Sequence, residues 1–201
     1  MLLKINRRLV LASESPRRLQ LLRQIGLEPE VIPPKINEDE VTDSSIIHLI
    51  QKLAESKGRS IAEKVEDGII ISADTIVALG DRVIGKPAGR DEAINMLREL
   101  SGKMHTVLTA IFILSTPSSY SITDYVQTKV YFRALSEKEI MLYVDTAKPL
   151  DKAGAYGIQD SGALFVQKIE GCYNNVMGFP LTRFYEMMID PDNRKRLSLS
   201  E

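Results

Sequence analysis

Apolar residues occur along the chain in two kinds of pattern, short continuous runs and stripes with helical spacing. Runs rich in β-branched residues between turn residues predict strands, and apolar positions three and four residues apart predict amphipathic helices. In the first half of the chain these patterns predict a strand at Leu9–Ala12, a helix from Ser15-Pro16 to Gly26, a helix starting at Thr42-Asp43-Ser44, and a strand at Gly68–Leu79 that turns at Gly80-Asp81 into Arg82–Ile84. A helix from Asp91 to Gly102, strands at about 104–114 and 120–133, and a helix from Ser136 to about Val144 are predicted next. The last predicted elements are a Gly-rich loop from Asp151 to Gly162, a strand at Ala163–Lys168, a last helix opened by Pro180 and a polar tail from Pro191 onward.

Some of these strands follow one another directly, and others are separated by helices. Direct connections suit antiparallel pairs, whereas parallel pairs need a crossover such as a helix. We therefore predict a mixed α/β fold around one large sheet. A chain of 201 residues, 44% of them hydrophobic, is long enough to bury one good core, so we expect a single domain over residues 1–201.

The charge balance narrows the classes of partner. The chain has 26 Lys and Arg against 27 Asp and Glu, a formal net charge of −1, so no overall positive field attracts nucleic acid or an anionic membrane. Any anion site must be local. Cys172 is the one cysteine in the sequence, which excludes an internal disulfide and suits a reducing cytosol. The sequence contains only two histidines, His48 and His105, in addition to this cysteine, which is too few ligands for a zinc site of the Cys/His type.

The apolar segments give no targeting or membrane signal. The run after Arg7-Arg8 has only four apolar residues, well short of the core of a secretory signal peptide. No stretch approaches the roughly 20 apolar residues that span a bilayer. We expect a soluble, cytoplasmic protein without nucleic-acid or membrane partners.

The segment Ser13-Glu14-Ser15-Pro16-Arg17-Arg18 combines a helix start with two cations. A helix amino terminus favours an anion through its unpaired N–H groups and its dipole, and two arginines in the first turn oppose that dipole unless an anion is bound there. Each guanidinium can form paired hydrogen bonds to phosphate oxygens. The alternative is that both arginines are solvated or pair with Glu14 or Glu28.

Asp74 lies inside the apolar run Gly68–Leu79. An aspartate is expensive to bury there alone, so it should meet a cation, a metal or a hydrogen-bond donor. When ionised, it can hold a divalent metal or take a proton from water. The alternative is a carboxylate that accepts hydrogen bonds from backbone N–H groups at a bulge.

Four other polar residues are candidates for the same chemistry. Lys57 continues the inward stripe of its predicted helix, and Lys86 precedes Pro87 just past the hairpin. Gln159, in the Gly-rich segment, offers the paired donor and acceptor that can read a nucleobase edge, and Glu38 could supply a carboxylate to a metal. The alternatives are a lysine whose stem covers the core, a surface lysine, a surface-loop glutamine and a solvated acidic run.

Together these residues indicate a phosphorylated ligand and a divalent metal. Phosphate charge must be neutralised by cations, while a carboxylate-bound Mg²⁺ or Mn²⁺ activates water. No Gly-x-Ser-x-Gly segment is present, and Cys172 has no histidine near it in the sequence, so nothing indicates a nucleophilic triad. From the residues alone, a phosphoanhydride hydrolase and a nucleotide-binding protein both remain open.

Five segments, in their order and spacing, resemble the Maf family of nucleoside-triphosphate pyrophosphatases over almost the whole chain. They are Leu11-Ala12-Ser13-x-Ser15-Pro16-Arg17-Arg18, Ala73-Asp74-Thr75-x-Val77 followed by Gly85-Lys86-Pro87, Ser101-Gly102-x-x-His105-x-Val107-x-Thr109, Pro149-Leu150-Asp151-Lys152-Ala153-Gly154-Ala155-Tyr156-Gly157-Ile158-Gln159, and Gly171-x-Tyr173-x-x-Val176-x-Gly178-x-Pro180. The resemblance implies the fold of the inosine-triphosphate pyrophosphatase superfamily, with a long curved mixed sheet and two lobes around a central cleft. It also implies metal-dependent hydrolysis of a nucleoside triphosphate to the monophosphate and pyrophosphate, and a possible homodimer.

The same resemblance implies a role for each matching residue. Asp74 takes the position of the proton acceptor and Glu38 that of an acidic residue near the metal, so both are expected at a Mg²⁺ or Mn²⁺ ion. The specificity residues that it implies are Arg17, Thr75 and Gln159, and the phosphate-binding residues are Ser13, Arg17, Arg18, Lys57 and Lys86.

The segment around Gln159 resembles the branch of the family that acts on dTTP and UTP rather than on 7-methyl-GTP. A glutamine amide can pair with the imide edge of uracil or thymine, and modified pyrimidine nucleotides are implied as further substrates. Two positions depart from the family pattern, Glu14 in place of a small or neutral residue and Phe179 in place of leucine. The rival hypothesis is a regulator of septum formation and cell division that senses a nucleotide and binds a protein partner.

Overall fold

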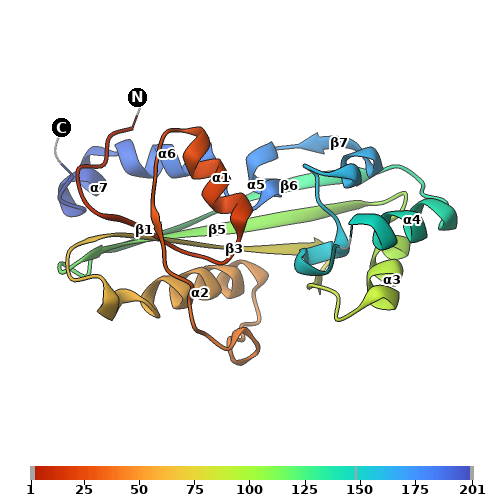
Figure 1. Cartoon of the computed structure of the whole chain (residues 1–201), viewed down its shortest axis with the longest axis horizontal. Coiled ribbons are helices and arrows are strands. Elements are labelled where there is room, and N and C mark those ends of the chain that lie inside the picture. Colours follow the sequence, from red (N-terminus) through yellow and green to blue (C-terminus); the bar gives the residue numbers. More distant parts are fainter. Residues whose placement is uncertain (1–2, 148, 200–201) are drawn as a thin grey trace. The chain divides into compact units, whose positions relative to one another are not determined.

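The computed structural model describes residues 3–147 and 149–199, and its elements largely follow the predicted alternation (Figure 1). The strands are β1 Leu9–Ala12, β2 Glu30–Val31, β3 Gly68–Leu79, β4 Arg82–Ile84, β5 Met104–Thr116, β6 Ser121–Phe132 and β7 Val166–Glu170. The α-helices are α1 Pro16–Gln24, α2 Ile46–Arg59, α3 Arg90–Leu100, α4 Glu137–Ala147, α5 Tyr173–Met177, α6 Leu181–Ile189 and α7 Pro191–Arg196. The 3₁₀ turns are η1 Glu38–Glu40, η2 Ala62–Lys64, η3 Pro149–Asp151, η4 Ala153–Ala155 and η5 Ser161–Phe165. Within the described ranges no helix has the length and apolar character to cross a membrane.

The strands form one mixed sheet in the order β2-β1-β3-β5-β6-β7, with β4 paired to β3. β1 runs parallel to β2 and to β3, while the β3–β4 and β6–β7 pairs are antiparallel. The parallel pairs are those whose connections contain α1 and α2, because parallel strands need a crossover. The β3–β4 hairpin turns at Gly80, where φ is 61°. The predicted mixed α/β fold is confirmed.

The described chain divides into two compact units. The first consists of Met1–Asp74, Thr109–Val126 and Gly178–Glu201, and the second of Thr75–Leu108 and Gln127–Met177. The long strands β3, β5 and β6 each contribute residues to both units. The expectation of one domain over residues 1–201 stays a prediction.

In the first unit, helices cover both faces of the strands. Figure 1 shows α1 and α6 on one face and α2 on the other. Strands covered on both faces read as continuous apolar runs, which explains β1 and the start of β3. Ala12, the last residue of β1, pairs with Ser72 of β3. The chain therefore leaves β1 at Ser13, beside the part of β3 that carries Asp74.

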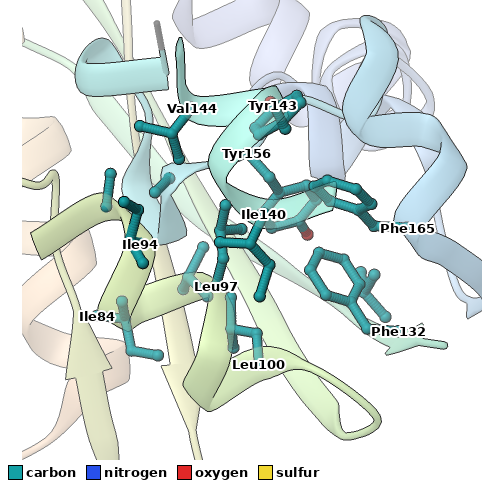
Figure 2. Packing of buried hydrophobic residues seen from close by; sticks show 14 of the residues in the cluster. Ile84, Ile94, Leu97, Leu100, Phe132, Ile140, Tyr143, Val144, Tyr156 and Phe165 are labelled. Atoms are coloured by element: carbon teal, nitrogen blue, oxygen red, sulfur yellow. The ribbon is translucent and has the colours of Figure 1, made fainter. Parts of the chain in front are cut away.

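The second unit has its own apolar core, shown in Figure 2. Helices α3 and α4 bury apolar residues in this core together with the ends of the long strands and the Gly-rich segment, whereas Met141 and Leu142 of α4 stay exposed. The buried residues labelled in Figure 2 are Ile84, Ile94, Leu97, Leu100, Phe132, Ile140, Tyr143, Val144, Tyr156 and Phe165.

The prediction of a polar tail from Pro191 is wrong, because α7 forms there and α6 is not the last helix. Asp190 caps α7 by accepting a hydrogen bond from the Asn193 N–H at 2.9 Å, and Pro191 is at a favoured first position. Beyond the helix, Leu197 and Leu199 are buried. The helix has no buried residue of its own and is too short to be recognised from periodicity, and the burial of the two leucines that follow it stabilises it.

Other differences are shifts of element bounds. The second helix starts at Ile46 rather than near Thr42, because Asp43 accepts a hydrogen bond from the Ser45 N–H at 2.9 Å and forms a turn before the helix. The strand predicted from Ala163 starts at Val166, since η5 occupies the residues before it. The short β2 and α5 carry no periodic signal and were missed. The helix start predicted at Ser136 is confirmed.

His105 on β5 is a buried histidine in the second unit. Its Nε2 lies 2.8 Å from the Tyr156 hydroxyl, and its ring packs edge-on against Phe132 with centroids 4.9 Å apart. Burial lowers the pKa of His105 from 6.5 to about 4, because the charged imidazolium is desolvated. The folded protein therefore holds a neutral imidazole at pH values where the unfolded chain is protonated.

This difference makes stability depend on pH. Above about pH 6.5 neither the folded nor the unfolded state binds the proton, so the full free energy of unfolding is present. As the pH falls toward 4, the unfolded state gains the proton first. We therefore expect the free energy of unfolding to fall by about 3 kcal/mol through this group. The measurement is urea unfolding between pH 7 and 4. His105→Gln should flatten the slope, and His48→Gln, at an exposed histidine, should keep it. Equal slopes in wild type and His105→Gln would contradict the prediction.

Candidate active site

The loop between β1 and α1 brings Ser13 and Arg18 together in the first unit. The Ser13 hydroxyl accepts hydrogen bonds from the Ser15 N–H at 3.1 Å and from Arg18 Nη1 at 3.3 Å. Arg18 Nε donates to the carbonyl oxygen of Gly178 at 3.0 Å. Ser15 is the N-cap residue and Pro16 begins α1, as predicted. The Arg18 guanidinium is thus held in one orientation at the start of a helix.

Arg18 is also buried, with only 9% of its surface exposed. Burial is the largest influence on its pKa and lowers it, the carboxylates of Asp74 and Glu38 raise it, and Arg17 lowers it. Arg17, Asp74 and Glu38 are therefore all close enough to act electrostatically on Arg18. Two cations and a helix amino terminus at one place favour an anion with several oxygens.

Three acidic or aromatic neighbours bear on this site. Glu28, one of the alternative partners for the arginines, pairs with Arg23 at 2.9 Å. Glu14 is exposed, so its carboxylate remains solvated. Phe179 is fully buried and its ring lies 5.2 Å from that of Phe184.

A lysine between two carboxylates forms the second part of the site. Lys57 Nζ bonds to Asp74 Oδ1 and lies 2.9 Å from Glu38 Oε1. Lys57 and Asp74 are buried, with 7% and 6% of their surfaces exposed, whereas Glu38 is exposed. A buried carboxylate requires a partner, and for Asp74 this partner is a cation rather than the backbone donors of a bulge.

The position of Lys57 follows from how closely α2 approaches the sheet. A Cβ on Gly58, the next residue, would lie 2.5 Å from the Phe112 ring and 2.8 Å from the Ser72 hydroxyl. That hydroxyl donates to the carbonyl oxygen of Ala54 at 2.6 Å. Ser72 and Asp74 are two residues apart on β3 and share a face of the strand, so the contact that anchors α2 at Ser72 also aligns Lys57 with Asp74.

Glu38 and Asp74 are the residues that could hold a divalent metal. Both carboxylates contact the same ammonium, so their oxygens lie near one another. Mg²⁺ is commonly held by one or two carboxylates, water and substrate phosphates, and this pair fits such a partial donor set. Among the residues in the described ranges, no three His, Cys, Asp or Glu side chains are grouped closely enough to hold a metal ion by themselves.

The remaining expected site residues belong to the second unit. Thr75 follows Asp74 directly, and the pleat of β3 directs their side chains to opposite faces, so Thr75 does not share the face on which α2 packs. Lys86 is exposed just after β4. Its neighbour Gly85 accepts a hydrogen bond from the N–H of Gly154 at 3.0 Å, which joins the segment after the hairpin to the Gly-rich segment.

Gln159 is exposed in a turn of the Gly-rich segment, whereas Gly157 and Ile158 before it are buried. Its amide is therefore presented to solvent from a segment that is otherwise anchored. Sequence reasoning missed the residues that anchor it, Tyr143 and Asp160, which contact each other at 3.1 Å. The available signal was Asp160 two residues before Gly162, an aspartate spacing that often caps a turn.

Known proteins match this chain over most of its length. The family model described as Maf-like protein matches residues 8–190. A protein of Carboxydothermus hydrogenoformans named dTTP/UTP pyrophosphatase is 46% identical over 178 residues, which are 89% of this chain and 95% of that protein. One of Acetivibrio thermocellus with the same name is 45% identical over 190 residues, 91% of this chain and 94% of that protein.

A solved structure, titled as that of the Staphylococcus aureus Ham1 protein, matches 62% of this chain and 71% of that chain with 15% sequence identity and a TM-score of 0.42. The sequence matches are far longer and closer. Because the family model covers residues 8–190 and the relatives are about 45% identical over nine-tenths of the chain, the chain belongs to the Maf family.

Proposed function

We propose that this protein is a nucleoside-triphosphate pyrophosphatase that hydrolyses dTTP and UTP to dTMP and UMP with release of pyrophosphate. The names of its relatives support this activity. The observation that carries the proposal is the buried Lys57–Asp74 pair, whose carboxylate acts electrostatically on the buried Arg18 at the start of α1. These groups supply a base that can accept a proton from water and cations that can bind a triphosphate.

In this proposal Asp74 accepts the proton of the attacking water. The water oxygen forms the new bond to one phosphorus of the α–β anhydride as the bond from that phosphorus to the bridging oxygen breaks, and the electron pair stays on that oxygen in the departing group. Lys57 holds the Asp74 carboxylate in place. The residues proposed to bind the triphosphate are Ser13, Arg17, Arg18, Lys57 and Lys86. The two arginines and two lysines among them neutralise the developing negative charge on the leaving group.

We assign Glu38 and Asp74 to a divalent metal, Mg²⁺ or Mn²⁺. When bound, such an ion neutralises phosphate oxygens and lowers the pKa of a bound water. The two carboxylates supply the negative charge, and their shared contact with Lys57 keeps them adjacent before substrate binds. Removal of divalent ions by a chelator is expected to abolish pyrophosphate release.

Base selection is proposed to rest on Gln159, with Arg17 and Thr75 as the other specificity residues. The imide edge of uracil or thymine presents an acceptor and a donor, which a glutamine amide complements. Gln159→Glu removes the donor, so we expect kcat/KM for UTP relative to CTP to fall by about ten- to a hundred-fold. The measurement is pyrophosphate release with both nucleotides.

Gln167→Glu, at an exposed glutamine on β7, is the matched control and should leave the ratio unchanged. An unchanged ratio in Gln159→Glu would remove Gln159 from base recognition. A loss of turnover equal for both nucleotides would also contradict a role confined to the base edge.

The activity itself is tested by incubating the pure protein with Mg²⁺ and a panel of nucleoside triphosphates. We expect pyrophosphate and monophosphate from dTTP and UTP, with less from purine nucleotides. If no nucleotide released pyrophosphate, the result would contradict the proposal. We further propose that the enzyme is a cytoplasmic homodimer that acts on free nucleotides without nucleic-acid or membrane partners. The role in septum formation stays the rival hypothesis.

A further inference from the structure

The turn that carries Gln159 is closed by a chain of hydrogen bonds within the second unit. The backbone N–H of Gly157 donates to the Tyr143 hydroxyl at 3.0 Å, and that hydroxyl donates to Asp160 Oδ1 at 3.1 Å. The same carboxylate oxygen accepts the N–H of Gly162 at 2.8 Å. Gln159 lies inside this closed loop, directly before Asp160.

The Tyr143 hydroxyl is a fixed point rather than a mobile group. Tyr143 projects from α4 and is buried, and its ring packs edge-on against Phe165 with centroids 4.8 Å apart (Figure 2). Burial, together with the Asp160 carboxylate, raises the pKa of Tyr143 above its usual value. The hydroxyl therefore stays protonated near neutral pH and donates to Asp160, while its oxygen accepts from Gly157.

The turn is tightly packed around its two glycines. A Cβ on Gly157 would collide with the Asp160 carboxylate, and one on Gly162 would lie 2.6 Å from the Gly157 carbonyl oxygen. Lys152 is the nearby cation, with Nζ 3.9 Å from Asp160 Oδ2 and 2.7 Å from Asp151 Oδ1. The carboxylate that closes the turn is thus compensated by a hydroxyl, a backbone N–H and an ammonium.

We propose that Tyr143 and Asp160 are positioning residues that set the pyrimidine preference by orienting Gln159. Neither is proposed to touch the nucleotide. An exposed glutamine on an unanchored loop loses conformational entropy when it orders on a base, whereas an anchored backbone presents its amide in one place and makes recognition more selective. This inference rests on the proposed function, because it concerns selection between substrates of that reaction.

The test is a double-mutant cycle between Tyr143→Phe and Gln159→Ala. Tyr143→Phe keeps the ring but removes the hydroxyl, so we expect the UTP-over-CTP ratio of kcat/KM to fall about ten-fold. In the Gln159→Ala background the same substitution should leave the ratio unchanged, since there is no amide left to orient. A merely structural role would lower the turnover of both nucleotides alike in both backgrounds, and that additive result would overturn the inference.

Conservative variants and a second readout complete the experiment. Asp160→Asn keeps Oδ1 as an acceptor and should keep the ratio, while Asp160→Ala should lose it; Tyr131→Phe, whose hydroxyl contacts Glu170 on the surface, should have no effect. Hydrogen exchange of the 158–162 amides should accelerate in Tyr143→Phe, and unchanged exchange would overturn the anchoring. Absence of hydrolysis in the wild type would contradict the proposed function, while the exchange measurement would still decide whether Tyr143 anchors the turn.

Discussion

Asp74→Asn is expected to lower kcat for dTTP and UTP by about 10²- to 10⁴-fold, because an amide cannot accept the proton of the attacking water. Asparagine has the shape of aspartate and can still accept a hydrogen bond from Lys57, so the fold should be retained. The measurement is steady-state pyrophosphate release, with far-ultraviolet circular dichroism to verify folding. KM should change less than kcat if substrate binding depends mainly on the cations.

Asp81→Asn is the matched control for this prediction. Asp81 is exposed in the turn after β3, and asparagine suits such a turn, so both kcat and stability should stay near their wild-type values. If Asp74→Asn retained near-normal turnover while the control behaved as expected, Asp74 would not be the proton acceptor.

Lys57→Met is expected to lower the free energy of unfolding by about 3 to 5 kcal/mol, because it leaves a buried carboxylate without its ammonium. Lys57 and Asp74 are each less than a tenth exposed, so solvent cannot substitute for the lost partner. Urea unfolding measures the change. The double variant Lys57→Met with Asp74→Leu should recover most of the loss, since replacing a buried ion pair by apolar groups is often neutral or stabilising.

The control is Lys52→Met on the same helix. Lys52 is exposed and pairs with Asp43 at 2.7 Å, and such surface pairs contribute about 1 kcal/mol or less. If Lys57→Met were no more destabilising than Lys52→Met, the buried pair would not hold α2 against β3. If the double variant were as unstable as Lys57→Met, the loss would come from packing and not from the unpaired carboxylate.

These two variants separate two roles of the same pair. The Asp74 substitution tests the reaction at almost constant structure, and the Lys57 substitution tests the structure that supports the reaction. Because Glu38 also contacts Lys57, a metal held by the two carboxylates would partly replace the missing ammonium. Mg²⁺ is therefore expected to stabilise Lys57→Met more than the wild type, which unfolding with and without the ion would measure.

Local patterns by themselves determined most of the elements. The bounds of β1 and β3 are those predicted, since a β-branched run between turn residues has few alternatives. The start of α4 follows from its capping box, in which the Glu139 N–H donates to the Ser136 hydroxyl at 3.3 Å and the Ser136 N–H to the Glu139 carboxylate at 2.9 Å. Such signals act within four residues and need no tertiary contacts.

The sequence also indicated which residues carry the chemistry, but not how they pair. Helical spacing showed that Lys57 faces inward, yet the choice between covering the core and meeting Asp74 depends on how closely α2 approaches β3, which Gly58 permits. The burial of Arg18 likewise has no local signal. Nor does its hydrogen bond to the carbonyl oxygen of Gly178, which lies 160 positions further along the chain.

Elements that are stabilised by distant contacts have no local signal and are visible only in the folded protein. Helix α7 is too short to form from propensity, and the burial of Leu197 and Leu199 stabilises it. The turn at Gln159 is similar, because its anchor Tyr143 comes from another helix. Hydrophobic period and capping are properties of neighbouring residues, whereas burial and ion pairing are properties of residues that meet only after the chain has folded.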